Sequence, residues 1–178
     1  MKNYSVLSYD QSCSLGYWIL HQKECFRFPV VYKDGLVSRL KTSLKGREPW
    51  GILCKGHIVS VRNAPKKMTP QEAKEYCDHQ AIAGRCTYVP PMRVMRALLK
   101  NVATVNEIIR ELGGDELESK WYMATNDRFT SNFGGAPRDD IMLGISLLHL
   151  DDCDEKGRKI CWEVGPDTKI AFYPAVKI

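Results

Sequence analysis

The sequence predicts an α+β protein with a mainly antiparallel sheet and with its helices in the middle of the chain. Short runs rich in aromatic and β-branched residues occur before residue 62 and again after residue 120. The stretch between them shows helical spacing of apolar residues and helix start signals. Strands, then helices, then strands is the order of α+β domains rather than of alternating α/β domains.

The first third of the chain is expected to be β-rich. Three strands are predicted where aromatic and β-branched residues lie between polar or glycine breaks, at residues 4–9, 16–20 and 25–32. Two hairpin turns follow, one at Asp34-Gly35 and one at Lys55-Gly56. The second turn joins the strands predicted at residues 50–54 and 57–61.

The most clearly marked helix begins at Pro70. Thr69 is a hydroxyl N-cap, Pro70 occupies the first helical position, and Glu72 can reach back to the cap in a capping box. We expect this helix to run from about residue 70 to residue 80. Its buried face should contain Ala73, Tyr76, Cys77 and Ala81.

Two more helices are predicted before residue 115. Pro90-Pro91 precede the first of them, in which apolar residues recur at helical spacing: Met92, Met95, Leu99 and Val102. Thr104 and Glu107 repeat the capping-box spacing before the next helix, and Gly113-Gly114 end it.

After Trp121 the pattern returns to strands. These are predicted within KWYMAT, IMLGISLLHL, KICWEV and KIAFYPAVKI, which are separated by polar and glycine-containing loops. The N-terminal and C-terminal strands could pair and close the sheet.

Composition limits the classes of protein to consider. The 178 residues, 44% of them hydrophobic, suffice for one domain, and the net charge of +5 is too small to require a nucleic-acid partner. The start of the chain lacks the features of a secretory signal, and no apolar run reaches membrane-spanning length. We therefore expect no membrane partner, synthesis in the cytoplasm, and reduced thiols among the seven cysteines.

Several sequence blocks resemble a known module in their order and spacing. They are PWGILCKGHIVSVRNA, MTPQEAKEYC, GRCTYVPPMRVMRALL, VATVNEIIRELGG, KWYMATNDRF and the closing KIAFYPAVKI. This order resembles the C-type-lectin-like domains of gut bacteria and their phages, which are similar in fold to formylglycine-generating enzymes and to phage variable ligand-binding proteins. The resemblance implies a C-type-lectin-like domain at residues 48–178, preceded by a β-rich extension or attachment segment at residues 1–47.

The polar stretch at residues 126–140 is the best candidate for recognition, because long loops on a rigid scaffold often bind ligands. Its aromatic residues could stack on a sugar or enter a partner's pocket. Alternatively, Phe129 and Phe133 tuck under the loop and order it. The predicted ligand-binding residues are Trp121, Tyr122, Asn126, Asp127, Arg128, Phe129, Asn132, Phe133 and Arg138.

No catalytic or metal site is expected. The triplet Glu-Pro-Asn or Gln-Pro-Asp of calcium-dependent lectins is absent, and Asn126, Asp127, Asp139 and Asp140 could supply only some of the oxygens that calcium needs. Cysteine and histidine occur at spacings unlike those of structural zinc sites, at Cys54, His57, Cys77 and His79. A bound calcium ion remains an alternative.

These observations favour a non-enzymatic recognition or assembly module. We expect a phage virion component, such as a fibre, decoration or tail protein, that forms a homo-oligomer and contacts other virion proteins or a host surface glycan. Such a protein is made in the host cytoplasm and later acts outside it. The alternatives are a bacterial cell-surface or fimbria-associated adhesin and, less favoured, an enzyme or a metal protein.

Overall fold

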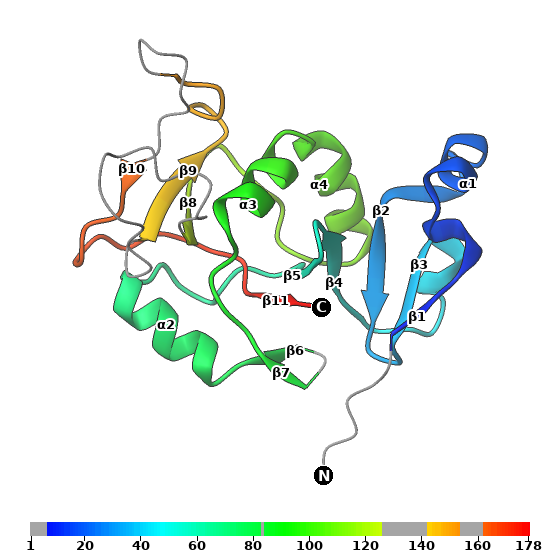
Figure 1. Cartoon of the computed structure of the whole chain (residues 1–178), viewed down its shortest axis with the longest axis horizontal. Helices are drawn as coiled ribbons and strands as arrows, with labels where there is room; N and C mark the ends of the chain where they lie inside the picture. The colour runs from blue at the N-terminus through cyan, green and yellow to red at the C-terminus, as the bar shows by residue number, and fades with distance from the viewer. Residues whose placement is uncertain (1–6, 83, 126–141, 154–161) are drawn as a thin grey trace.

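The computed structural model describes residues 7–82, 84–125, 142–153 and 162–178, and it shows an α+β fold with mostly antiparallel sheets (Figure 1). The described residues form four α-helices and two short 3-10 helices. They are η1 (Gln11–Cys13), α1 (Leu15–Leu20), η2 (Lys41–Leu44), α2 (Pro70–Asp78), α3 (Met92–Leu99) and α4 (Val102–Glu111).

The largest sheet has six strands in the order β1-β3-β2-β4-β5-β11. Only the β1–β3 pair is parallel, and the other neighbours are antiparallel. The six strands are β1 (Ser8–Tyr9), β2 (Cys25–Tyr32), β3 (Leu36–Leu40), β4 (Pro49–Cys54), β5 (His57–Ser60) and β11 (Ala175–Lys177).

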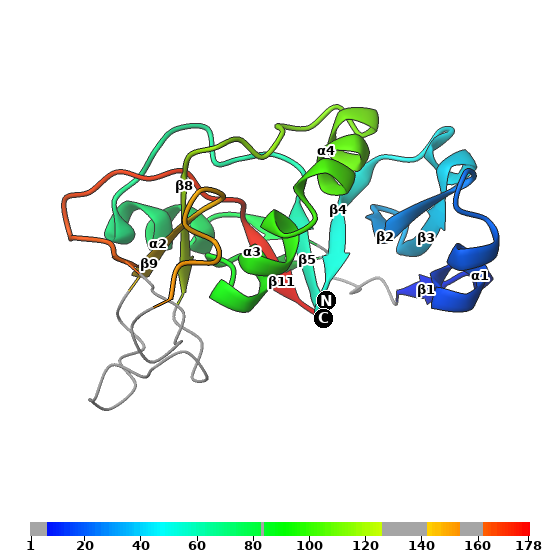
Figure 2. The same cartoon turned by 90° about the horizontal axis from the view of Figure 1, so that it is seen from above.

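Two smaller antiparallel sheets complete the strands that the structure describes. One is the hairpin of β6 (Ala81–Ile82) and β7 (Arg85–Cys86). The other has the order β10-β9-β8 and consists of β8 (Trp121–Thr125), β9 (Met142–Ser146) and β10 (Trp162–Glu163). Figures 1 and 2 show this small sheet at one end of the molecule and β1, β3 and α1 at the other, with α3 and α4 between them.

The main hydrophobic core joins the two larger sheets through α3 and α4. It contains Met95 of α3 and Ile108 of α4 together with Ile52 of β4 and Ile145 of β9, all nearly inaccessible to water. A second cluster, which includes Cys77 of α2 and Met123 of β8, packs α2 against β8. Burial of this size is the dominant stabilising term for a domain.

Three local predictions, one capping box and two hairpin turns, are confirmed. Thr69 Oγ1 accepts from the Glu72 N–H at 3.3 Å, and Glu72 Oε2 accepts from the Thr69 N–H at 2.9 Å, which completes the capping box. Gly35 and Gly56 adopt φ of 88° and 74° in the two predicted hairpin turns. These signals act within a few residues, so no distant contact is needed to make them effective.

Several other expectations were wrong. Residues 16–20 belong to helix α1 instead of a strand, because Ser14 Oγ accepts from the Tyr17 N–H at 3.1 Å and caps a helical turn. Helix α4 begins at Val102 behind Asn101, so Thr104 lies inside the helix and does not cap it. Ala81 lies in β6 and is exposed instead of on the buried face of α2.

The expected closure of the sheet by its first and last strands is not found. Strand β11 pairs with β5, and β1 pairs with β3, so the two lie at opposite edges of the six-stranded sheet. Strands β2 and β4 pair directly, and this pairing links residues 1–47 to the residues that follow.

Two further findings concern the described residues only. No helix among them combines the length and the apolarity that crossing a bilayer requires. Their six cysteines are free, and Cys25, Cys54 and Cys77 are buried.

A candidate binding pocket between two tryptophans

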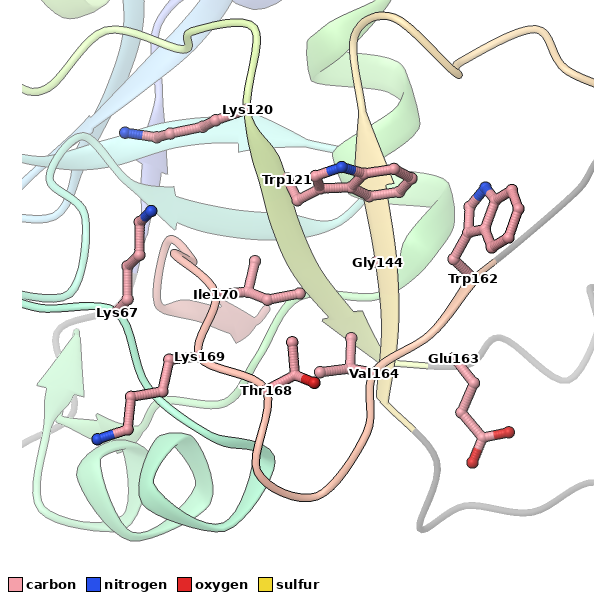
Figure 3. A pocket seen from close by; sticks show the side chains of 10 residues that line it. All are labelled: Lys67, Lys120, Trp121, Gly144, Trp162, Glu163, Val164, Thr168, Lys169 and Ile170. Carbon is pink, nitrogen blue, oxygen red and sulfur yellow. The ribbon is translucent and has the colours of Figure 1, made fainter.

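A pocket of about 410 Å³ opens beside the three-stranded sheet (Figure 3). Strands β8, β9 and β10 form one wall, and the segments that precede α2 and β11 form the other. The lining combines two indoles with three lysines. Its residues are Lys67, Lys120, Trp121, Gly144, Trp162, Glu163, Val164, Thr168, Lys169 and Ile170.

The strand register explains why the two tryptophans meet. Gly144 of β9 pairs with Met123 of β8 and with Trp162 of β10. Paired residues point to the same side of a sheet, and so do residues two apart along one strand. Trp121 therefore shares its face with Trp162 and with the glycine between the strands.

Trp121 is held by aromatic contacts on two sides. Its ring lies 6.3 Å from that of Trp162 in an edge-to-face arrangement, with an interplanar angle of 83°. His149 stacks on it at 5.2 Å and 16°, and the same imidazole Nδ1 lies 2.8 Å from Asp152 Oδ2. These contacts fix the indole, whereas Trp162 remains 53% exposed.

The lysines gather at the other end of the pocket. Lys120 Nζ lies 3.1 Å from Glu118 Oε2. The same ammonium group lies 5.6 Å from the centroid of the Tyr122 ring. Lys169 Nζ lies 3.6 Å from Oε1 of Glu72 in α2. In the view of Figure 3 the side chain of Lys67 runs toward the end of the Lys120 side chain, while Lys169 turns away.

The pocket can hold a small ligand that has a flat or ring-shaped apolar surface and polar substituents. Its indoles offer stacking surfaces, and each indole carries one N–H donor that no described residue accepts. Thr168 adds a hydroxyl group at the rim. This mixture of aromatic walls and a few polar groups is typical of ligand sites in proteins.

Two of the nine predicted ligand-binding residues are described by the structure. Trp121 lines the pocket, but Tyr122 is fully buried, and its side chain packs on Tyr173 and accepts a hydrogen bond from the Glu118 N–H at 2.8 Å. Its role is in the core. The other seven lie outside the described residues: Asn126, Asp127, Arg128, Phe129, Asn132, Phe133 and Arg138.

Trp162 and the lysines were missed by the sequence analysis. They come from segments far apart in the chain, and only the pairing of β9 with both β8 and β10 brings Trp162 to Trp121. The sequence did contain one signal for Trp162, because it is a tryptophan within KICWEV, a short segment that was predicted to be a strand.

Metal ligands do not cluster in the described part of the chain, where no group of three acidic, histidine or cysteine side chains is placed to hold an ion. His57 Nδ1 lies 2.8 Å from the Lys55 carbonyl, and His79 Nδ1 lies 2.7 Å from that of Glu75. The residues considered for calcium, Asn126, Asp127, Asp139 and Asp140, lie outside this part.

Buried thiols in the described core are poor nucleophiles. Burial raises the pKa of Cys54 to about 11 and that of Cys77 to about 11, so both thiols are protonated at neutral pH.

No family model, curated protein or solved structure matches this chain.

Proposed function

We propose that this protein is a non-enzymatic recognition module that binds a glycan in the pocket between Trp121 and Trp162. The observation that supports this most directly is the pair of indoles on one sheet face, one fixed and one half-exposed, above a cavity of about 410 Å³. A sugar ring presents C–H groups to an aromatic face and hydroxyl groups to N–H and O–H partners, so it suits this lining.

The scaffold that we propose is a C-type-lectin-like domain. Its support is the order of sequence blocks described above, together with an α+β architecture in which the last strand, β11, pairs with β5. The indole pocket lies on the small sheet that follows the central helices, and two of its strands, β8 and β9, flank residues 126–141 in the sequence.

The setting that we propose is a phage virion, in which the module contacts other virion proteins and a host surface glycan as part of a fibre, decoration or tail. The six described cysteines are free, as expected of a protein assembled in a reducing compartment. Repetition of a weak sugar site in a homo-oligomer would raise its avidity without any new contact.

A glycan array with matched tryptophan variants tests the sugar site. Trp162→Ala should abolish binding and leave the melting temperature within a few degrees, because this side chain is half-exposed. Trp18→Ala is the control, because it removes an indole from α1 at the far end of the molecule (Figure 1). Failure of the wild-type protein to bind any glycan, or equal binding by Trp162→Ala, would contradict the proposal.

A further inference from the structure

We infer that the ligand of the tryptophan pocket carries an anionic group, a carboxylate or a sulfate, which binds at Lys67, at the end of the pocket that Lys120 also lines. This inference rests on the proposed function and specifies the chemical class of the glycan. The pocket has an aromatic end and a cationic end, so an acidic sugar would place its ring on the indoles and its charge at the lysines (Figure 3).

Lys67 is the cation of the two that no described carboxylate neutralises. Among the residues that the structure describes, no carboxylate forms an ion pair with it, whereas Lys169 is held by Glu72. Lys67 follows Lys66 in the segment before the N-cap of α2, and its side chain is exposed. In Figure 3 this side chain runs toward the end of Lys120. Because no described carboxylate neutralises Lys67, its ammonium group can bind an anion without first breaking an ion pair.

Lys120 supplies a positioned second charge. Its side chain is 29% exposed, and it is kept in place by Glu118 and by the ring of Tyr122. Less side-chain entropy is therefore lost when it contacts a ligand. Glu118 neutralises part of its charge, which leaves Lys67 as the larger contributor to anion affinity.

The acidic residue of the lining does not cancel this arrangement. Glu163 belongs to β10, and in Figure 3 its carboxylate points away from the lysines. At the lysine end the pocket is therefore positive, and at the other end the indoles offer apolar surface. An ammonium group forms its strongest hydrogen bonds with ionised acceptors, so a carboxylate or sulfate is preferred there over a hydroxyl group.

Matched ligand pairs test the charge requirement by titration calorimetry. The pairs are oligogalacturonate with its methyl ester, sialyllactose with lactose, and sulfated with unsulfated lactose. For at least one pair, the acidic member should bind about tenfold more tightly than the neutral one. The difference should shrink as salt is raised from low ionic strength to 0.5 M, because ions screen the attraction.

Charge-neutral variants locate the effect. Lys67→Gln should remove most of the preference for the acidic member and leave the affinity for the neutral member unchanged. Lys23→Gln is the control, because it removes the same charge from an exposed position after α1, at the far end of the molecule. An equal loss of this preference in both variants would overturn the inference, because it would show that the acidic ligand is attracted by the net charge of the protein alone.

The remaining outcomes separate the inference from the proposed function. Suppose that neutral and acidic members bind with equal affinity, and that this binding is lost in Trp162→Ala but not in Lys67→Gln. The inference of an anionic ligand would then be overturned, while the proposed glycan site would stand. Absence of binding to every glycan, acidic or neutral, would overturn both.

Discussion

The indole of Trp121 lies so close to the backbone of Gly144 that a Cβ atom at position 144 would stand 3.1 Å from Cε3 of Trp121. Contacts between a real Cβ and its neighbours are rarely that short, so the indole occupies space that only a glycine leaves open. The glycine of β9 therefore positions the stacking surface on β8 without contacting a ligand itself.

Gly144→Ala is expected to displace Trp121 and to weaken ligand binding several-fold. The ring must shift by a few tenths of an ångström against His149, and crowding of this kind costs about 1 kcal/mol of the free energy of unfolding. Tryptophan fluorescence and calorimetric affinity measure the two effects. Gly16→Ala in α1 is the control, because a Cβ at position 16 would meet open space. A fluorescence spectrum that is unchanged in Gly144→Ala would show that the position of Trp121 does not depend on the glycine.

Gly114→Ala should destabilise the protein by roughly 2–3 kcal/mol, because a Cβ there would overlap the carbonyl oxygen of Val61. The overlap is with backbone atoms, which cannot move aside as a flexible side chain can. Its neighbour Gly113 has φ of 66° with open space around it, so Gly113→Ala should cost only about 1 kcal/mol. Urea unfolding of both variants gives the comparison, and equal losses would contradict it.

Thr69→Ala should lower the free energy of unfolding by about 1 kcal/mol through loss of the capping box. Thr104→Ala is a matched control, because Thr104 lies inside α4 and makes no cap. Its effect should stay within about 0.5 kcal/mol. Thermal unfolding of both variants measures the difference, and a neutral Thr69→Ala would refute the energetic role of the cap.

Stability should decline in alkaline solution between about pH 9 and pH 11, because the folded chain holds thiol protons, among them those of Cys54 and Cys77, that the unfolded chain releases at lower pH. Burial raises the pKa of Cys54 and of Cys77 from 9.0 to about 11. The resulting stabilisation is complete below the unfolded pKa and disappears as pH rises through the folded value. Urea unfolding of the reduced protein at pH 8, 9.5 and 11 measures it.

Cysteine variants separate this effect from general alkaline unfolding. The decline should be shallower for Cys77→Ala than for Cys86→Ala, because Cys86 is exposed on β7. Identical pH profiles for the two variants would show that the buried thiol does not contribute.

Sequence alone predicted several of the parts of the fold that local chemistry determines. The capping box at Thr69 and the turns at Gly35 and Gly56 need only residues that are neighbours in the chain, and all three were found. Helix α1 was predicted as a strand because Tyr17, Trp18 and Ile19 have high β-propensity. That propensity reflects packing on a half-buried sheet, and α1 has no buried residue, so the cap at Ser14 decides its conformation.

The candidate site was only half predictable for a related reason. Trp121 lies in a strand that the sequence marks clearly, and it reaches the pocket. Trp162 reaches the pocket from a later segment of the chain, because β10 pairs with β9. Lys67 reaches it from an earlier segment, the one that leads into α2. Non-local register of this kind has no short sequence signature.

The pairing of β2 with β4 makes the N-terminal strands a cover for an otherwise unpaired sheet edge. In a chain cut at residue 48, β4 would expose a row of backbone donors and acceptors together with the normally buried side chain of Ile52. Unprotected edges of this kind recruit strands from other molecules. The first 47 residues would then act as an intramolecular guard against aggregation, and their removal would lead to insoluble protein.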